Sequence, residues 1–271
     1  MTRRALVTGV SSGIGKAITR ALLADGWSVI GLSRGYPKGL DAPVGYGAGE
    51  FVWLHGNLTT GYKLSWLVEY VEHGLDALIH CGAEQGPVGS FLETDGYDWE
   101  LCIQTNLIGT TRVLRGALPK LLKSPDGRVL LFAGGGAFNP RPEHTAYAAS
   151  KAGVVSLMET LAAELTDTSV TVNCVSPGFV PTPMTGHTDG GSHEMDRAVA
   201  CVMYLLSPAA RGLTGKTISA EYDAWQTIHP ASVPHLNASA MGTRSRVKIW
   251  EVESDGSYVY RTEQNGAGVI V

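Results

Sequence analysis

Cysteine, charge and long apolar runs are all scarce in this sequence. Its four cysteines, Cys81, Cys102, Cys174 and Cys201, form no Cys-x-x-Cys pair, which argues against a disulfide framework and a structural zinc site. No apolar run approaches the ~18 residues of a membrane span, and the opening residues leave no room for a signal-peptide h-region. We therefore expect reduced thiols, no membrane partner and a cytoplasmic location.

A basic surface is missing as well. The chain has 21 Lys and Arg against 25 Asp and Glu, a net charge of −4, and it contains no basic run. Nucleic acid is therefore an unexpected partner. What the 271 residues do have is 44% hydrophobic side chains, enough to bury a large core.

Short apolar runs alternate with stretches of helical periodicity. The runs expected as buried strands are 5–7, 28–32, 51–54, 77–80, 128–132 and 170–175. Between these runs, apolar residues recur at the spacing of one helix face, for example Val154, Leu157, Met158, Leu161 and Leu165. This alternation predicts an α/β fold: a single Rossmann-like, doubly wound parallel sheet with helices on both faces.

The alternation continues to about residue 220, which predicts a dinucleotide-binding domain over 1–220 and a C-terminal extension over 221–271. In the extension, apolar runs at 247–252 and 258–260 flank Asp255-Gly256, a favoured hairpin turn. Segments 35–49 and 184–192 are glycine-rich and are expected as loops, the second as a mobile lid.

A glycine-rich turn, Thr8-Gly9-Val10-Ser11-Ser12-Gly13-Ile14-Gly15, joins the first strand to the first helix. Glycines let the backbone approach a pyrophosphate, whose charge suits the exposed amides of a helix N-terminus. The alternative interpretation is the phosphate-binding loop of a nucleoside triphosphatase. That loop needs a Ser or Thr hydroxyl for Mg²⁺ directly after Gly-Lys, where this chain has Ala17.

The spacing Thr-Gly-x-x-x-Gly-x-Gly resembles that of the classical short-chain dehydrogenase/reductase family, and the resemblance extends from residue 3 to about 220. Further landmarks follow in order: His80-Cys81-Gly82-Ala83, Asn106, the Tyr-x-x-x-Lys motif at Tyr147 and Lys151, and Pro177-Gly178-Phe179-Val180-Pro181-Thr182. The resemblance implies cofactor contacts at Gly9, Ser11, Ser12, Gly13, Ile14, Gly15, Ser33, Arg34, Asn57, Leu58, Cys81, Gly82, Ala83, Tyr147, Lys151, Pro177, Gly178, Val180 and Thr182.

The end of the second strand predicts which dinucleotide is bound. An acidic residue there selects NAD, whereas this chain has Ser33 followed by Arg34. A small side chain leaves room for a 2′-phosphate, and a guanidinium supplies a charge-assisted partner. We expect NADP in preference to NAD; the alternative is that Arg34 is an ordinary solvated residue.

Tyr147 and Lys151 lie four residues apart, hence on one face of a helix. A free phenol, with a pKa of about 10, is a poor base at neutral pH, and a nearby ammonium favours the phenolate. The resemblance implies that Tyr147 exchanges a proton with the substrate hydroxyl, that Lys151 also binds the nicotinamide ribose, and that Asn106 holds a water in the proton relay. It implies a ketone or secondary-alcohol substrate and a homodimer or homotetramer.

One expected group is absent. The family's serine, thirteen residues before the tyrosine, corresponds to Gly134, and the position before it is Ala133. Loss of such a donor typically costs on the order of 10²–10³ in rate. Three explanations stay open: other groups polarise the carbonyl (the amides of Gly134 or Gly135, or Asn139, His144 or Thr145); the chemistry is epimerisation or dehydration; or the protein binds NADP without turnover, as a sensor or partner.

Other polar residues are given plain interpretations. His187, Asp189 and His193 resemble a metal-ligand set, but on a glycine-rich loop they are expected to be solvated, and no metal is predicted. His80 is expected to be packed and bonded to backbone. Cys81 is expected to be a buried, unreactive thiol, and Phe179, Val180 and Met184 are expected to line the mouth of the site.

Overall fold

The structure is a computed structural model that describes residues 2–40, 50–60, 74–187, 192–223, 225–227, 250–252 and 258–260. The chain divides into two compact units, Met1–Ser239 and Ala240–Val271. The domain boundary expected at residue 220 stays a prediction.

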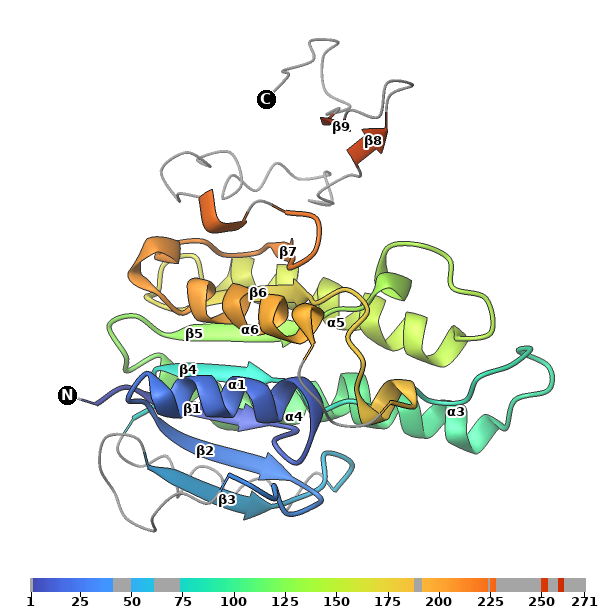
Figure 1. The fold of residues 1–271 in the computed structure, drawn as a ribbon, viewed down its shortest axis with the longest axis horizontal. Coiled ribbons are helices and arrows are strands. Elements are labelled where there is room, and N and C mark those ends of the chain that lie inside the picture. Colours follow the sequence, from blue (N-terminus) through green and yellow to red (C-terminus); the bar gives the residue numbers. More distant parts are fainter. Residues whose placement is uncertain are drawn as a thin grey trace. The chain divides into compact units, whose positions relative to one another are not determined.

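A seven-stranded sheet forms the centre of the first unit, with the strand order β3-β2-β1-β4-β5-β6-β7 (Figure 1). The strands are β1 (Arg4–Thr8), β2 (Ser28–Ser33), β3 (Phe51–His55), β4 (Ala77–His80), β5 (Arg128–Phe132), β6 (Thr171–Ser176) and β7 (Thr217–Ser219). Each neighbouring pair is parallel, so the doubly wound parallel sheet predicted from the sequence is confirmed.

The strand order reverses between β1 and β4, the two central neighbours whose register pairs Thr8 with His80. Chain connections leave these two strands toward opposite sides, which opens a crevice at the carboxyl ends of the strands. The glycine-rich turn after β1 and the segment after β4 therefore meet at this edge of the sheet.

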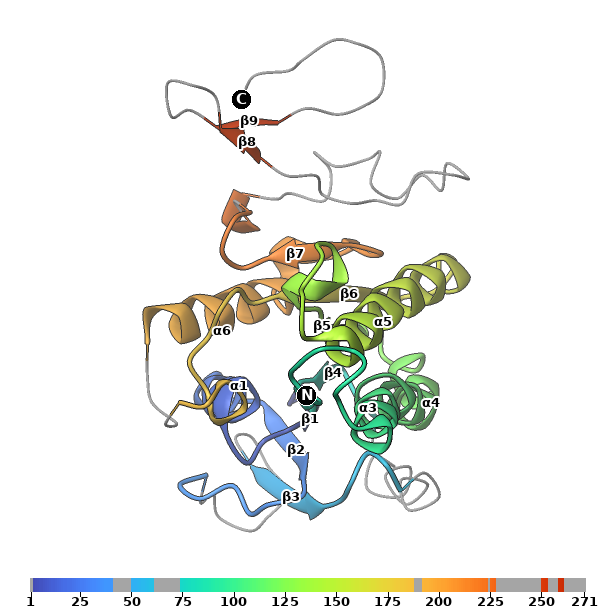
Figure 2. The same cartoon turned by 90° about the vertical axis from the view of Figure 1, so that its right-hand side faces the viewer.

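Helices cover both faces of the sheet (Figure 2). Helices α1 (Gly13–Ala24) and α6 (His193–Leu205) lie on one face, and α3 (Gly96–Ile103), α4 (Gly109–Leu121) and α5 (Thr145–Glu164) lie on the other. Short 3₁₀ turns occur at Gly135–Ala137, Pro183–Thr185, Pro208–Ala210 and Trp225–Thr227.

Two apolar clusters sit on the two faces because strand side chains alternate in direction. On β5, Val129 and Leu131 join the cluster that contains Val154 and Met158 of α5. Leu130 and Phe132 join the other cluster, which contains the apolar stripe of α1 and the residues Val202 and Leu205 of α6. Both faces of the sheet are thus buried, as its near-continuous apolar strands predict.

A π-helical segment, η2 (Gln104–Ile108), interrupts the helix that begins at α3 and continues as α4. The helix starts where Asp95 accepts hydrogen bonds from the backbone amides of Tyr97 and Asp98, an N-cap that satisfies two free amides. The π-helical segment contains Thr105 and Asn106, both buried. Such segments are frequently found at functional sites.

The second unit contains β8 (Trp250–Val252) and β9 (Tyr258–Tyr260), which pair antiparallel with Glu251 opposite Val259. These are the two strands of the hairpin predicted from the sequence. The turn dipeptide Asp255-Gly256 lies outside the described residues, as does most of this unit.

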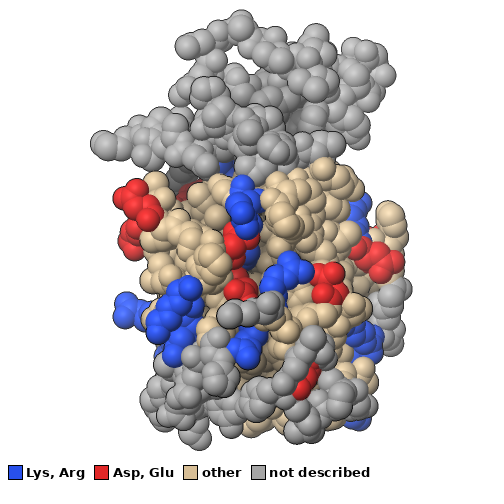
Figure 3. Space-filling view, turned by 90° about the vertical axis from the view of Figure 1, so that its left-hand side faces the viewer, with Lys and Arg blue, Asp and Glu red and all other residues tan. Residues whose placement is uncertain are grey.

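Charges of both signs are interspersed on the surface of the described residues seen in Figure 3. Ion pairs such as Arg3 with Asp25 (3.0 Å) and Arg211 with Asp126 (3.4 Å) contribute to this mixture. Within the described part of the chain, every helix is too short or too polar to cross a membrane.

Candidate functional site

Four glycines at the carboxyl edge of the sheet, Gly9, Gly13, Gly15 and Gly82, form what we name the glycine cradle. Gly9 and Gly13 have φ of 75° and 55°, which side chains other than glycine rarely adopt. A Cβ on Gly15 would lie 2.5 Å from the carbonyl oxygen of Gly9, and one on Gly82 would lie 2.8 Å from Leu58 Cδ1. The backbone is therefore bare where the first helix begins, as a pyrophosphate site requires.

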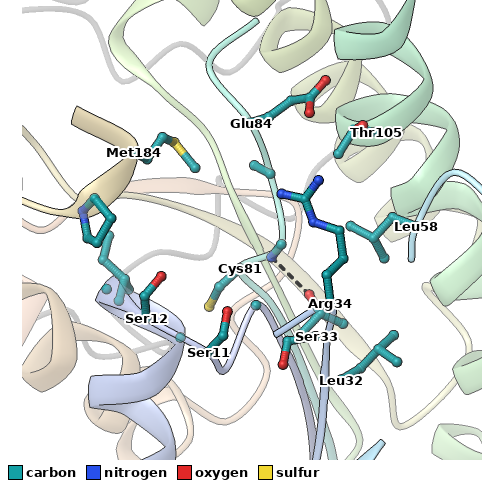
Figure 4. A pocket seen from close by; sticks show the side chains of 18 of the residues that line it. Ser11, Ser12, Leu32, Ser33, Arg34, Leu58, Cys81, Glu84, Thr105 and Met184 are labelled. Carbon is teal, nitrogen blue, oxygen red and sulfur yellow. Dashed lines mark hydrogen bonds between the residues drawn. The ribbon is translucent and has the colours of Figure 1, made fainter. Parts of the chain in front are cut away.

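A pocket of about 410 Å³ opens beside the cradle (Figure 4). Fourteen residues expected to contact a dinucleotide line it: Gly9, Ser11, Ser12, Gly13, Ile14, Gly15, Ser33, Arg34, Asn57, Leu58, Cys81, Gly82, Ala83 and Thr182. The structure thus brings together residues at or after the carboxyl ends of five strands, β1, β2, β3, β4 and β6.

Other expected contacts do not line this pocket. Tyr147 and Lys151 stand on α5, and Pro177 and Gly178 precede the pocket-lining Thr182. Val180 is expected from the sequence to line the mouth of the site. Its side chain is instead buried in an apolar cluster with Met195 and Ala198 of α6. Phe179 lies against the His187 ring at 5.7 Å and is largely exposed, whereas Met184 does line the pocket.

The pocket is also lined by residues that were not predicted as cofactor contacts: Thr8, Leu32, Gly56, Glu84, Gln85, Thr105 and Pro183. Gly56 directly follows β3 and Glu84 follows the landmark at 80–83, so a rule extending each strand end by a few residues could have found them. Thr105 reaches the pocket only because the π-helical segment presents it, which no sequence signal indicates.

Ser33 and Arg34 have different roles in this pocket. The Ser33 hydroxyl donates to the carbonyl oxygen of Gly35 (2.8 Å) and accepts from Trp53 Nε1 (3.0 Å), so its proton is already used within the protein. The Arg34 side chain extends into the pocket in Figure 4. Any recognition of a 2′-phosphate here therefore depends on the Arg34 guanidinium, with Ser33 keeping the space open.

Thr8 holds the segment after β4 in place. Its hydroxyl oxygen accepts from the backbone amide of Gly82 (2.9 Å) and lies 2.9 Å from His80 Nδ1. His80 is packed as expected, but its partner is this side chain rather than backbone, and its Nε2 has no partner among the described residues. Burial, with the positive charge of Lys151, lowers the pKa of His80 to about 3, so the ring is neutral at pH 7.

Tyr147 and Lys151 lie on the first two turns of α5. The Lys151 ammonium is buried. It donates a hydrogen bond (2.9 Å) to the carbonyl oxygen of Phe132, the last residue of β5. Its Nζ lies 5.6 Å from the centroid of the Tyr147 ring, and the Arg141 guanidinium carbon lies 5.7 Å from the same centroid. Two cationic groups therefore lie within 6 Å of the centre of the phenol ring.

Asn106 ties the segment after β4 to α5. Its Oδ1 accepts from the Glu84 amide (2.8 Å), while its Nδ2 lies within hydrogen-bond distance of the Glu84 carbonyl oxygen (2.8 Å) and Ser150 Oγ (3.0 Å). The Asn106 carbonyl oxygen accepts from the Thr110 hydroxyl (2.5 Å). Its amide protons are thus used by protein groups, which indicates a positioning role; the water expected at Asn106 stays a prediction.

Neither Gly134, at the position of the family's serine, nor Ala133 before it has a side-chain hydroxyl. Ala133 belongs to the apolar cluster with Val154, so its side chain points into the core. Gly134 is buried, and a Cβ there would lie 2.8 Å from Tyr147 Oη and 2.8 Å from Tyr147 Cε1. The space expected for a serine is therefore filled by the phenol ring.

The other groups expected to polarise a carbonyl are partly occupied. Thr145 Oγ1 accepts from Trp99 Nε1 (3.1 Å), and His144 Nε2 lies 3.2 Å from Gln85 Nε2. Because His144 Nδ1 lies 2.9 Å from the Pro142 carbonyl oxygen, the proton belongs on Nδ1 and Nε2 accepts from Gln85. Asn139 is exposed.

The remaining sequence candidates are not charged or paired as reactive groups. Cys81 is half-buried and lines the pocket, rather than buried as expected, and desolvation raises the pKa of its thiol, which fits an unreactive cysteine. His187 Nδ1 lies 3.2 Å from Thr185 Oγ1, and Asp189 lies outside the described residues.

Comparisons with known proteins agree with this geometry. The family model for short chain dehydrogenases matches residues 3–191. A 3-oxoacyl-[acyl-carrier-protein] reductase of Synechocystis sp. is 29% identical over 235 residues, covering 80% of this chain and 94% of the relative.

Two solved structures are similar in fold and sequence. A protein from Pseudomonas syringae described as a short chain dehydrogenase superposes with a TM-score of 0.72 at 28% identity, covering 81% of this chain and 94% of that one. An actinorhodin polyketide ketoreductase with NADPH superposes with a TM-score of 0.69 at 26% identity, covering 80% and 95%. The chain therefore belongs to the short-chain dehydrogenase family, oxidoreductases that bind NAD(P).

Proposed function

We propose that this protein is an NADP-dependent oxidoreductase that interconverts a ketone and a secondary alcohol, with Tyr147 and Lys151 as its acid–base pair. One observation carries the proposal: a buried lysine ammonium, anchored on the Phe132 carbonyl oxygen, lies 5.6 Å from the ring of a tyrosine on the same helix. Burying a lysine is costly unless its amine is hydrogen-bonded, so a buried lysine beside a phenol suggests a role in proton transfer.

The residues fit a dinucleotide. A Cβ on Gly9, Gly15 or Gly82 would collide with neighbouring protein atoms, so only glycine allows the close packing that leaves bare backbone for a pyrophosphate. Arg34 would hold the 2′-phosphate, and Asn57 and Leu58 would border the adenine. When bound, NADP accepts a hydride from the alcohol or, as NADPH, gives one to the ketone.

The chain's own residues handle the proton. In the reduction, the Tyr147 hydroxyl donates its proton to the substrate oxygen, and in the oxidation the phenolate takes it back. Lys151 stabilises the phenolate by charge and has ammonium protons left for a ribose hydroxyl after its bond to Phe132. Asn106 joins the segment after β4, at Glu84, to α5, at Ser150, the helix that carries Tyr147.

Two of the similar proteins support a carbonyl substrate, because one is a 3-oxoacyl-[acyl-carrier-protein] reductase and the other a polyketide ketoreductase holding NADPH. We test the proposal by following NADPH oxidation with a panel of ketones for the wild-type protein and Tyr147→Phe. We expect turnover that falls by at least ~100-fold in the variant while NADPH affinity is kept. Undiminished turnover in Tyr147→Phe would contradict the proposed mechanism.

A second candidate is an NADP-binding protein that does not turn over. Gly134 favours it, since no side-chain hydroxyl at this position can join the phenol in binding a substrate oxygen. Tight NADPH binding with no oxidation of any alcohol and no reduction of any ketone would favour this second candidate.

A further inference from the structure

We infer that Gly134 is a positioning residue that seats the Tyr147 phenol, so that a serine at this position would displace the phenol rather than assist it. The inference rests on the proposed function for its kinetic consequences, but not for its structural ones. It reverses the simple interpretation of Gly134 as a lost hydroxyl.

The backbone at Gly134 does not itself require glycine. Its φ of −152° and ψ of 160° are ordinary extended values that any residue adopts. The requirement comes from space alone, because a Cβ would lie 2.8 Å from both Oη and Cε1 of Tyr147 and 3.2 Å from Cζ. Two carbons in van der Waals contact are about 3.5–4.0 Å apart, so even an alanine overlaps the ring.

The backbone around Gly134 cannot easily move away from the ring. The Ala133 amide donates to the Val175 carbonyl oxygen (2.9 Å), and the Gly134 carbonyl oxygen accepts from the Ala137 amide (2.8 Å). The 3₁₀ turn that follows, Gly135–Ala137, packs closely against α5, because a Cβ on Gly136 would lie only 3.0 Å from Ala148 Cβ. Any added side chain at 134 must therefore be accommodated by the phenol.

The phenol, in turn, can move only at the cost of its neighbours. Its ring centroid lies 5.6 Å from Lys151 Nζ and 5.7 Å from the Arg141 guanidinium carbon. A shift away from residue 134 changes the distance between the phenol and the buried ammonium that stabilises its charge. The rate of proton transfer is sensitive to displacements of about 1 Å, so we expect the catalytic rate to fall.

Gly135 offers a matched control. It is the adjacent residue, it is exposed, and a Cβ there would meet nothing within 4 Å. Gly135→Ser therefore adds the same atoms to the same turn without contacting Tyr147, and it keeps the backbone amide, the one group of this residue that was a candidate to polarise the carbonyl.

The experiment compares Gly134→Ala, Gly134→Ser and Gly135→Ser in the full chain by three measurements: kcat for ketone reduction, the Kd of NADPH, and the Tyr147 ring position in crystals. We expect kcat to fall at least ~10-fold in both Gly134 variants and to stay within ~2-fold in Gly135→Ser. The Kd of NADPH should stay within ~3-fold throughout, which shows that the variants fold and that the cradle is intact.

Faster turnover in Gly134→Ser than in wild type would overturn the inference, because the added hydroxyl would then be assisting the reaction. So would crystals of Gly134→Ala with an unmoved ring. If wild-type protein reduces no ketone, the proposed function fails, yet the ring position still decides the inference: a displaced ring supports it and an unmoved ring overturns it.

Discussion

At the scale of one residue, we propose that Arg34 makes the protein prefer NADP to NAD. Since the Ser33 hydroxyl proton is bonded to the Gly35 carbonyl oxygen, the guanidinium is the charged group left to meet a 2′-phosphate. We predict that Arg34→Ala weakens NADPH binding by roughly 10–100-fold, the effect of losing a charge-assisted hydrogen bond, and changes NADH binding little. Isothermal titration with both cofactors measures this.

The control for this prediction is Lys38→Ala, which removes another exposed positive charge a few residues away. Equal losses in the two variants, or equal losses for NADPH and NADH in Arg34→Ala, would show that Arg34 acts only through general charge.

Burial of His80 is expected to make the free energy of unfolding depend on pH. Its pKa is lowered from 6.5 to about 3 in the folded protein, chiefly by burial. Between these values the unfolded chain binds the extra proton, so the contribution of the neutral ring is fully present above pH 6.5 and is lost progressively as the pH falls toward 3. At pH 5 the loss is about 2 kcal/mol of unfolding free energy.

Urea denaturation of wild type and His80→Asn at pH 7 and pH 5 checks this prediction. The wild-type protein should lose about 2 kcal/mol more than the variant over this interval. The same pH dependence in both proteins would show that His80 is not the group responsible.

At the scale of elements, the π-helical segment joins the segment after β4 to α5 through Asn106. This side chain is buried and lies within hydrogen-bond distance of both backbone groups of Glu84 and of Ser150 Oγ. We predict that Asn106→Ala lowers the unfolding free energy by roughly 2–4 kcal/mol, because it removes the hydrogen bonds of the buried Asn106 side chain to both half-buried backbone groups of Glu84 and to Ser150. NADPH affinity should fall too, since Glu84 lines the pocket.

Thr111→Ala is the matched control for this prediction, because the Thr111 hydroxyl donates to the Ile108 carbonyl oxygen (2.7 Å) at the end of the same segment without bonding to Glu84. Its loss should cost about 1 kcal/mol and leave NADPH affinity unchanged. If Asn106→Ala is no more destabilising than Thr111→Ala, the joining role is wrong.

The elements themselves could largely be predicted from the sequence. Apolar runs bounded by turns indicate buried strands, and observed bounds such as Arg128–Phe132 agree with the prediction. The pocket residues followed from the family spacing, because glycines mark where backbone must be bare. The π-helical segment was not predicted, and neither were the bonds of its Asn106 side chain, since Glu84 and Ser150 lie far from Asn106 in the sequence.

The Gly134 contact was equally invisible in the sequence. A missing serine can be read from spacing, but the position of the Tyr147 ring depends on how α5 packs against the turn at 135–137. The same reason explains Val180, whose buried position depends on α6.

For the whole molecule, the two compact units predict a tolerated truncation. Trp225 is buried, its Nε1 donates to the Ala220 carbonyl oxygen (3.3 Å), and its ring lies 5.7 Å from that of Tyr204 on α6. A chain ending at Ser239 keeps this tryptophan, whereas a chain ending at Ala220 loses it. We expect Tm to be unchanged in the first and to fall by roughly 5–15 °C in the second.

Differential scanning calorimetry of the two truncated chains and the full chain makes this comparison. A lower Tm for the chain ending at Ser239 would show that residues 240–271 stabilise the first unit. Size-exclusion chromatography of the same samples tests the predicted homodimer or homotetramer.

The most direct test of the central claim is the position of the nicotinamide ring in crystals grown with NADPH. We predict that the pyrophosphate lies against the glycine cradle, that a ribose hydroxyl lies within about 2.7–3.2 Å of Lys151 Nζ, and that the nicotinamide faces the Tyr147 phenol. A nicotinamide turned away from Tyr147, or a cofactor bound elsewhere on the molecule, would contradict it.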